Sequence, residues 1–190
     1  FQRICIFYRG VNGCGRMFSM PVDPKSLSLV IYPDPILRTM GEVVDPSDAI
    51  VQAVARRMIE IMLEQQGIGL AAPQIGLPWR LIVTRDPENE EGGIAWINPK
   101  LEVTNKELIS DEEGCLSLPE IRGEVRRPAG IQISGHSIDG KPITTQSDGF
   151  IARVWQHEND HLDGILITDK MSTMDKLINR RLIRTLERGR

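Results

Sequence analysis

Residues 156–162 read Gln-His-Glu-Asn-Asp-His-Leu and contain the pattern H-E-x-x-H. In an α-helix, positions i and i+4 lie on one face, so the imidazoles of His157 and His161 can reach one metal ion. Glu158 projects beside them, where a carboxylate can accept and return protons. The pattern therefore predicts a helix that carries two imidazole ligands of a metal site.

The residues before this motif predict that the helix lies in the core. Phe150 and Val154 precede the histidines at steps of three or four residues, which places all four side chains on one stripe. A buried imidazole pair needs partners for its ring nitrogens, and a metal ion supplies one. The five-residue pattern also arises by chance, and His157 and His161 are then ordinary core or surface histidines. A third ligand is needed to separate the two interpretations.

Two candidates for the third ligand fail. In the metzincin pattern H-E-x-x-H-x-x-G-x-x-H the third histidine falls at position 167, but this chain keeps Gly164 and has Ile167. His136 alternates with Gln132 and Ser134 along a predicted strand, which places it on the polar face and favours a solvated side chain. We therefore exclude the metzincin pattern and give His136 no role as a ligand.

Cys115 is the remaining candidate. It lies in Glu112–Pro119, next to a glycine that permits unusual backbone geometry and before a proline that ends the run. One thiolate and two imidazoles leave the fourth position of a tetrahedral ion open for water, as catalytic sites require. A free cysteine is also often a small buried apolar residue, so residue type alone leaves both interpretations open.

Composition restricts the class of protein. A chain of 190 residues, 41% hydrophobic and 26% charged, predicts one globular domain with a sizeable core. Its net charge of −3 offers no whole-chain case for binding nucleic acid. No apolar run approaches the roughly 18 residues of a membrane span. Three cysteines do not make a disulfide framework, which favours a reducing compartment.

The order of the predicted elements is that of an α+β fold. Asp45 and Pro46 have the residue types of a helix N-cap and a first helical position. The predicted elements are a helix from Asp45 to Gly67, antiparallel strands between Trp79 and Ser147, a helix from Ser147 or Asp148 to Gly164, and a helix from Thr173 to Glu187. We therefore expect antiparallel strands packed around a central H-E-x-x-H helix, with a C-terminal helix.

The first nineteen residues differ from the rest, because they contain three arginines and no acidic residue. A trimmed organelle-targeting segment, an extension ahead of a start at Met20 and residues added by cloning would all look like this. We treat residues 1–27 as a leader or extension and expect residues 28–190 to form a single catalytic domain.

Three segments together resemble the signature motifs of type 1 peptide deformylases, in the order found in that family. They are Gly67–Gln74 (Gly-Ile-Gly-Leu-Ala-Ala-Pro-Gln), Glu113–Ser117 (Glu-Gly-Cys-Leu-Ser) and Gln156–Leu162, and the lead-in Tyr32–Arg38 also matches. The resemblance covers residues 29–168. The first segment also fits the dinucleotide fingerprint G-x-G-x-x-A, but that fingerprint follows a strand and opens a helix. Here a helix precedes it and Pro73 interrupts it, so we exclude a nucleotide site.

The resemblance implies a metal-dependent hydrolase. Its substrates would be nascent polypeptides, from whose N-terminal formylmethionine it would remove the formyl group as formate. The ligands of one divalent ion per chain would be Cys115, His157 and His161. Iron(II) is typical of the family, and zinc, nickel or cobalt can occupy such a site.

The same resemblance implies catalytic and substrate-binding roles. Glu158 would take a proton from water and deliver it to the departing amine. The side-chain amide of Gln74 and the backbone N–H of Leu116 would donate hydrogen bonds to the oxyanion. The residues that would bind the substrate, including an apolar pocket for the methionine side chain, are Ile68, Gly69, Gln74, Gly114, Leu116 and Val154.

Four residues around the helix motif carry weaker expectations. Asp160 and Arg153 are candidates for groups that orient the imidazoles, because metal-binding histidines usually donate their second N–H to an acceptor. A solvated helix face is the alternative for Arg153. Asn159 occupies a position that is usually apolar in the family, and Trp155 is bulky, so both could alter the packing of the helix.

The predicted C-terminal helix has an apolar stripe of Leu177, Ile178, Leu182 and Leu186, together with arginines at positions 180, 181, 184 and 188. Some deformylases are thought to dock on the ribosome through such a helix, which implies a ribosome contact here. A solvated charged face is the alternative.

Two other functions fit part of the pattern. A metallopeptidase of the broad H-E-x-x-H class would cut internal peptide bonds, and a non-catalytic protein would use the Cys/His cluster as a structural or redox-sensing metal site. The latter needs a fourth ligand, for which the sequence offers no convincing candidate. We expect a bacterial cytoplasmic enzyme, or an organellar one if residues 1–19 belong to a transit segment.

Overall fold

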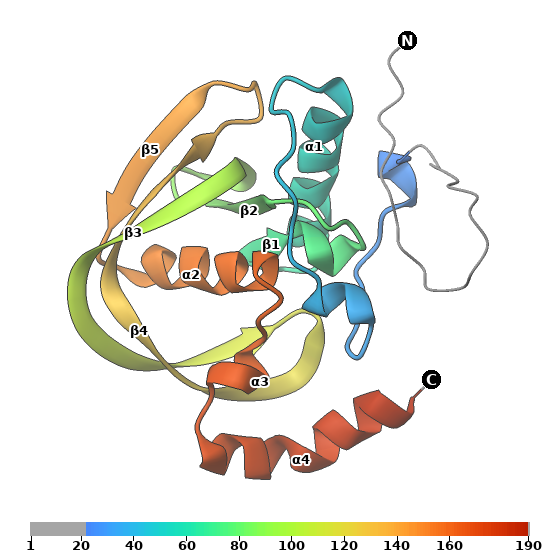
Figure 1. Ribbon diagram of the computed structural model, residues 1–190, viewed down its shortest axis with the longest axis vertical. Coiled ribbons are helices and arrows are strands. Elements are labelled where there is room, and N and C mark those ends of the chain that lie inside the picture. Colours follow the sequence, from blue (N-terminus) through green and yellow to red (C-terminus); the bar gives the residue numbers. More distant parts are fainter. Residues whose placement is uncertain (1–21, 190) are drawn as a thin grey trace.

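The computed structural model describes residues 22–189, and Figure 1 shows their arrangement. The strands of these residues form one antiparallel sheet in the order β1-β2-β3-β4-β5, so the prediction of a mixed α+β fold is confirmed. The elements in chain order are η1 (Pro24–Ser26), η2 (Pro35–Arg38), α1 (Ala49–Glu64), β1 (Gly69–Ala71), η3 (Ala72–Ile75), β2 (Leu81–Asp86), β3 (Asn89–Cys115), β4 (Leu118–His136), β5 (Pro142–Ser147), α2 (Phe150–Leu162), α3 (Ile167–Lys170) and α4 (Thr173–Arg188).

Helix α1 begins later than the sequence predicted. Asp48, not Asp45, is its N-cap and accepts a hydrogen bond from the backbone N–H of Ile50. Asp45 instead accepts from the backbone and hydroxyl of Ser47, which closes a turn before the helix. Both aspartates have the residue type of a cap, so the choice between them depends on where the turn closes.

The sheet combines the short strands β1 and β2 with the long strands β3 and β4. The segment that follows α1 forms strand β1, which pairs with β2 through Leu70 and Val83. Strand β2 pairs with β3 only as far as Ile97, and the rest of β3 pairs with β4 alone. This long β3–β4 pair curves around α2 in Figure 1. The outer edge of β1 and the part of β3 near Gly114 therefore carry backbone groups that no other strand of the described residues covers.

The apolar core lies on both sides of the sheet. Helix α1 buries Val54, Met58 and Met62 against Leu81 and Val83. Helix α2 packs against the residues Ile82, Trp96, Ile131 and Ile133 through Ala152, Trp155 and Leu162. Burial of each large apolar side chain contributes about 1.5–3 kcal/mol, so these contacts fix α2 inside the curved sheet.

Helix α2 begins at Phe150 with Gly149 as N-cap, and it ends at Leu162, two residues before the predicted Gly164. Val154 is buried as predicted. Phe150 is not, because its side chain is 59% exposed. The prediction of a continuous buried stripe is wrong at this residue, because Phe150 lines the open site cavity and is not packed into the core.

Helix α4 packs against the body through only part of its apolar stripe. Leu182 and Leu186 pack against the third core cluster, together with Ile183. Leu177 and Ile178, the first two residues of this stripe, are 60% and 70% exposed. Buried Asn179, whose side chain donates to the backbone carbonyl of Arg122, marks the inner face of α4.

The described part of the chain begins inside the predicted leader. Val22 and Leu27 are partly buried against the α1 core cluster. Residues 1–21, which make up most of the predicted leader, lie outside the described residues. None of the helices within residues 22–189 is long and apolar enough to cross a membrane.

Candidate metal centre

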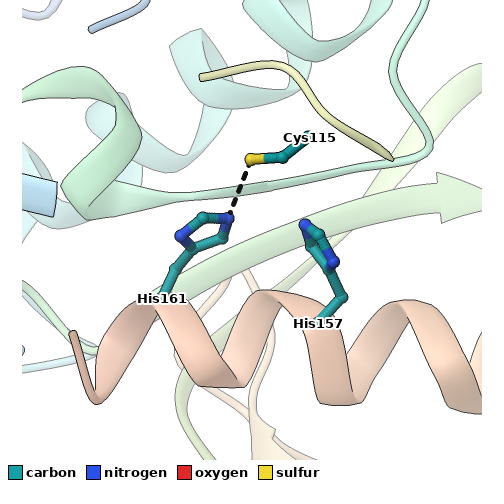
Figure 2. A group of neighbouring side chains, drawn as sticks. All are labelled: Cys115, His157 and His161. Atoms are coloured by element: carbon teal, nitrogen blue, oxygen red, sulfur yellow. Dashed lines mark hydrogen bonds between the residues drawn. The ribbon is translucent and has the colours of Figure 1, made fainter. Parts of the chain in front are cut away.

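The structure brings Cys115, His157 and His161 together. One ligand atom from each lies within 4.8 Å of the other two. The Sγ of Cys115 is 3.3 Å from Nε2 of His161, and the two imidazole centroids are 5.1 Å apart. Figure 2 shows both rings rising from α2 toward the cysteine at the end of β3. Among the side chains that the structure describes, which leave out those of residues 90 and 91, no other group of three His, Cys, Asp or Glu residues meets the same criterion.

A tight hairpin places the cysteine. Strand β3 ends at Cys115, which pairs with Leu118 at the start of β4. The pairing shifts register at Gly114 and Cys115, so the ladder is irregular beside the thiol. Leu118 and Ser117 are fully buried, which anchors the hairpin tip against the body. Packing of the hairpin therefore carries the sulfur to the face of α2 that presents the imidazoles.

The chemistry of this cluster fits a metal ion. At His157, burial alone would lower the pKa of the imidazole. Hydrogen bonds with Cys115 and Glu113 outweigh this effect, so the pKa of His157 is raised. Burial and the charge of His157 hold the pKa of His161 well below its usual value, so its ring stays neutral. Nδ1 of His161 is buried and finds no hydrogen-bond partner among residues 22–189. A sulfur and two nitrogens suit zinc, iron or a similar divalent ion, which would replace the proton on His157.

Glu158 lies against the backbone of β1. A Cβ on Gly69 would come within 2.7 Å of Cγ and 2.8 Å of Cδ of Glu158, so only glycine leaves room for this carboxylate. Glu158 is 4% exposed, and its Oε2 has no hydrogen-bond partner in the part of the chain that the structure describes. Burial, partly offset by the charges of His157 and Arg127, raises the pKa of Glu158 to about 7. A carboxylate with such a pKa is suited to exchanging protons near neutral pH.

Gln74 is held in a fixed orientation at the same place. Its Oε1 accepts a hydrogen bond from the backbone N–H of Ala71 at 2.8 Å. Its Nε2 therefore points toward the cluster, 3.5 Å from Sγ of Cys115 and 3.3 Å from Oγ of Ser117. The side-chain amide is buried at 2% exposure, so a hydrogen-bond donor is aimed at the site.

A cavity of about 540 Å³ opens above these residues. Cys115, His157 and Glu158 form part of its wall. The sequence-predicted substrate residues Ile68, Gly69, Gln74, Gly114, Leu116 and Val154 all line the same cavity. Phe150 stands at its exposed side, and Ile68 is 41% exposed. The cavity is therefore an open cleft with apolar residues in its lining and with Cys115, His157 and Glu158 exposed to it.

Glu113 is the functional residue that sequence reasoning missed. Its Oε2 lies 3.0 Å from Nδ1 of His157, so it is the acceptor that orients this imidazole. Arg127 binds the same carboxylate with two nitrogens, and Nη1 of Arg153 lies 2.7 Å from Oε1. Burial alone would raise the pKa of Glu113, but Arg127 and His157 hold it well below its usual value. The sequence offered one signal for this role. Glu113 lies two residues before Cys115, and alternate residues of a strand share a face, so both side chains could be expected on the side of the metal site.

Asp160 and Arg153 were expected to contact the imidazoles directly, but they instead contact the residues around Glu113. No hydrogen bond joins Asp160 to either imidazole among the described residues, and it accepts from Arg127 at 2.8 Å and from Lys170 at 2.7 Å. Arg153 is buried and not solvated, because it also donates to the backbone carbonyls of Ile109 and Val125. Both act on the site through Glu113 and Arg127.

The two unusual residues of the motif are accommodated without disturbing the helix. Asn159 and Asp163 are linked by a hydrogen bond, and Arg80 binds both of them, which ties the end of α2 to the start of β2. Trp155 packs edge to face on Trp96, with ring centroids 5.9 Å apart. His136 is half-buried on β4 and is not part of the cluster.

Comparison with known proteins places this arrangement in a family. A family model described as polypeptide deformylase matches residues 26–177, which is most of the chain. The chain belongs to the polypeptide deformylase family. The enzyme is therefore related to hydrolases, the peptide deformylases. The matched range includes all three segments that carry the metal cluster and Gln74.

Curated relatives and solved structures agree with this placement. The deformylase is 40% identical over 151 residues to a peptide deformylase from Agrobacterium fabrum, covering 78% of this chain and 88% of the relative. It is 40% identical over 148 residues to the chloroplastic peptide deformylase 1B of Solanum lycopersicum, covering 77% and 53%. A peptide deformylase structure from Plasmodium falciparum superposes with a TM-score of 0.79 at 39% identity, covering 85% and 96%. A peptide deformylase 1B structure from Arabidopsis thaliana gives 0.78 at 35% identity, covering 85% and 90%.

Proposed function

We propose that this deformylase is metal-dependent and removes the N-formyl group from the N-terminal formylmethionine of nascent polypeptides, releasing formate. The observation that carries the proposal is the Cys115, His157 and His161 cluster on the floor of an open cavity, with a buried carboxylate beside it. Helix α2, around which the β3–β4 pair curves, is the organising element of this site.

The proposed cofactor is one divalent ion held by the sulfur and the two ring nitrogens. Iron(II) is the proposed physiological ion, and zinc, nickel or cobalt fit the same donors. When bound, such an ion supplies Lewis-acid chemistry, which polarises a carbonyl and makes water a nucleophile near neutral pH. Glu113 fixes the ring orientation of His157, which keeps the ligand ready to bind.

The side chains of the cavity floor perform the proton transfers. Glu158 takes a proton from the attacking water and delivers it to the amine nitrogen as the C–N bond breaks, so the products are formate and a free amine. The Nε2 of Gln74 and the N–H of Leu116 donate to the oxygen that becomes negative. Loss of one such donor typically costs about 2.7–4 kcal/mol of barrier.

The uncovered strand ends favour an extended peptide as substrate. Strand β1 lies at the edge of the sheet, and β3 near Gly114 pairs with β4 on one side. A peptide in extended conformation can hydrogen-bond to both edges as an added strand. Gly69 and Gly114 then face its backbone, while Ile68, Leu116 and Val154 surround the apolar methionine side chain.

The outer face of α4 supports the proposed ribosome contact. Met174, Leu177 and Ile178 are at least 60% exposed there. The same helix lines a shallow cavity of about 460 Å³ with four arginines at positions 180, 181, 184 and 188. Arginine pairs well with phosphate, so this face suits ribosomal RNA.

The domain and location proposals rest on the comparisons. We propose that residues 28–190 are one catalytic domain preceded by a leader or extension, since the family match begins at residue 26. A bacterial cytoplasmic enzyme is the proposed setting, because bacterial peptide deformylases such as that of Agrobacterium fabrum are among its similar curated relatives. An organellar setting would agree with the chloroplastic relative from tomato.

Formate release tests the proposed reaction. The protein is loaded separately with iron(II), zinc or cobalt, metal content is measured, and formyl-Met-Ala is compared with Met-Ala. We expect one ion per chain, formate only from the formylated peptide, and no cleavage of Met-Ala. Cleavage of unformylated peptides would favour the metallopeptidase, and a metal-loaded protein without activity would favour a structural or redox site.

Glu158→Ala separates catalysis from metal binding. We expect unchanged metal content and a loss of nearly all turnover, because this carboxylate is not among the three ligands. Near-normal turnover would remove Glu158 from its role as the base.

Charge reversal on α4 tests the ribosome contact. The double variant Arg181→Glu, Arg184→Glu should pellet less with ribosomes than the wild type, with activity on formyl-Met-Ala retained. Lys106→Glu on exposed β3 is the matched control. Equal pelleting of all three proteins would contradict the contact. A deletion of residues 172–190 is less informative, because it also removes the inner face of α4.

A further inference from the structure

The inner face of α4 is bound to β4 by side-chain hydrogen bonds. Asn179 is the only buried residue of the helix within its described range Thr173–Arg188. Its Nδ2 donates to the backbone carbonyl of Arg122 at 2.7 Å and to that of Asp175 at 2.8 Å. An amide in this position is fully used as a donor, so the contact is specific and not a hydrophobic one.

Asp175 completes the contact one turn earlier. Its Oδ2 accepts the backbone N–H of Glu124 at 3.3 Å and the hydroxyl of Ser172 at 2.6 Å. In a strand, the N–H and C=O of one residue point to the same side and alternate along the chain. The outward groups of Arg122 and Glu124 therefore lie on one edge of β4. Two helical side chains occupy the place that a neighbouring strand would take.

Gly123 allows the helix to approach this closely. A Cβ on Gly123 would lie 3.0 Å from Cβ of Met171 and 3.2 Å from Cβ of Asp175. The backbone of Gly123 pairs in the opposite direction with Glu113, the residue that orients His157. The segment Arg122–Glu124 is thus held between α4 and the strand that forms the wall of the metal centre.

Arg122, the first residue of this restrained segment, lies at the rim of the cavity. It pairs with Gly114, and its side chain lies over that glycine, where a Cβ would be 3.3 Å from Nη1. The side chain is 66% exposed, lines the cavity and has only a loose ion pair with Glu112 at 3.9 Å. Since the described residues offer the guanidinium no closer ion pair than this one, its location depends on the backbone beneath it.

We propose that Asp175 and Asn179 are positioning residues, which hold the Arg122–Glu124 backbone so that Arg122 engages peptide residues downstream of the formylmethionine. This inference rests on the proposed function. Short substrates end before the rim and do not meet Arg122. Longer ones reach it, and there the guanidinium donates to peptide carbonyls or to the terminal carboxylate.

The test compares two substrate lengths, formyl-Met-Ala and formyl-Met-Ala-Ala-Ala, in the metal-loaded enzyme. The variants are Asn179→Ala and Gly123→Ala, which perturb the same contact from its two sides, with Thr173→Ala as the matched control on exposed α4. We expect KM for the longer peptide to rise about three- to tenfold in the first two variants, the range of one lost hydrogen bond. We expect kcat, metal content and both constants for the short peptide to stay within about twofold.

A combination with Arg122→Ala identifies the route of the effect. Arg122→Ala alone should raise KM for the longer peptide, and adding Asn179→Ala should then change it no further. Full additivity, an equal effect on both peptides, or wild-type KM in both Asn179→Ala and Gly123→Ala would overturn the inference. A wild-type enzyme that releases no formate from either peptide would instead overturn the proposed function.

Discussion

Replacing Gly69 by alanine should displace the base Glu158. The new Cβ would lie 2.7 Å from Cγ of Glu158, whereas ordinary contact begins near 3.4 Å. The side chain therefore has to move by about 0.7 Å at Cγ, and the nearer carboxylate oxygen has to move further. A misplacement of about 1 Å can reduce rate about 10²-fold, and a general base contributes about 10²–10⁴-fold. We expect kcat to fall about 10²-fold, with metal content unchanged.

Formate release from formyl-Met-Ala is the assay, with kcat and KM determined separately. Gly69 also lines the substrate cavity, so a direct clash with substrate would raise KM, whereas a displaced base lowers kcat. The matched control is Gly149→Ala at the start of α2, where a Cβ would make only an ordinary 3.5 Å contact with Ser147. It should keep wild-type kcat.

A double-mutant cycle tests whether Gly69→Ala acts through Glu158. In a Glu158→Ala background the base is already absent, so Gly69→Ala should lower kcat no further. The reasoning is refuted if Gly69→Ala keeps kcat within threefold (about 0.65 kcal/mol) of wild type. It is equally refuted if the two substitutions reduce kcat independently.

Three further perturbations follow from the contacts. Cys115→Ser should retain less metal after dialysis, because an alcohol is a poorer ligand than a thiolate for such ions, and an unchanged absorption spectrum of the cobalt-loaded protein would argue against sulfur ligation. Arg127→Met should lower the free energy of unfolding by about 3–5 kcal/mol in urea titrations, because it leaves the buried Glu113 carboxylate without its main partner, and a loss under 1 kcal/mol would contradict this. Arg38 holds the pKa of Asp169 below its usual value despite burial, so this pair stabilises the fold above the unfolded pKa and loses effect as pH falls. Asp169→Asn should therefore have a lower Tm than wild type at pH 7, with the gap closing in acid, and a gap independent of pH would refute the assignment.

The local part of the site could be predicted because it depends on residues close together in the chain. A spacing of four residues places His157 and His161 on one face of any helix, whatever surrounds it. The alternation of short apolar runs likewise indicated antiparallel strands between Trp79 and Ser147. The resemblance to a family then supplied Cys115, which spacing alone left open between a ligand and a buried apolar residue.

What the sequence by itself determined was the helix, its paired imidazoles and the mixed fold class. Tertiary structure decided which distant groups meet them. The Cys115 thiol lies 46 positions before His161 and reaches it only because the β3–β4 hairpin closes in one register. The same register gives Glu113 its role and, with the face that α4 turns inward, leaves Leu177 and Ile178 exposed. Periodicity reports only neighbours within a few residues, while long-range pairing depends on the combined packing of the whole core.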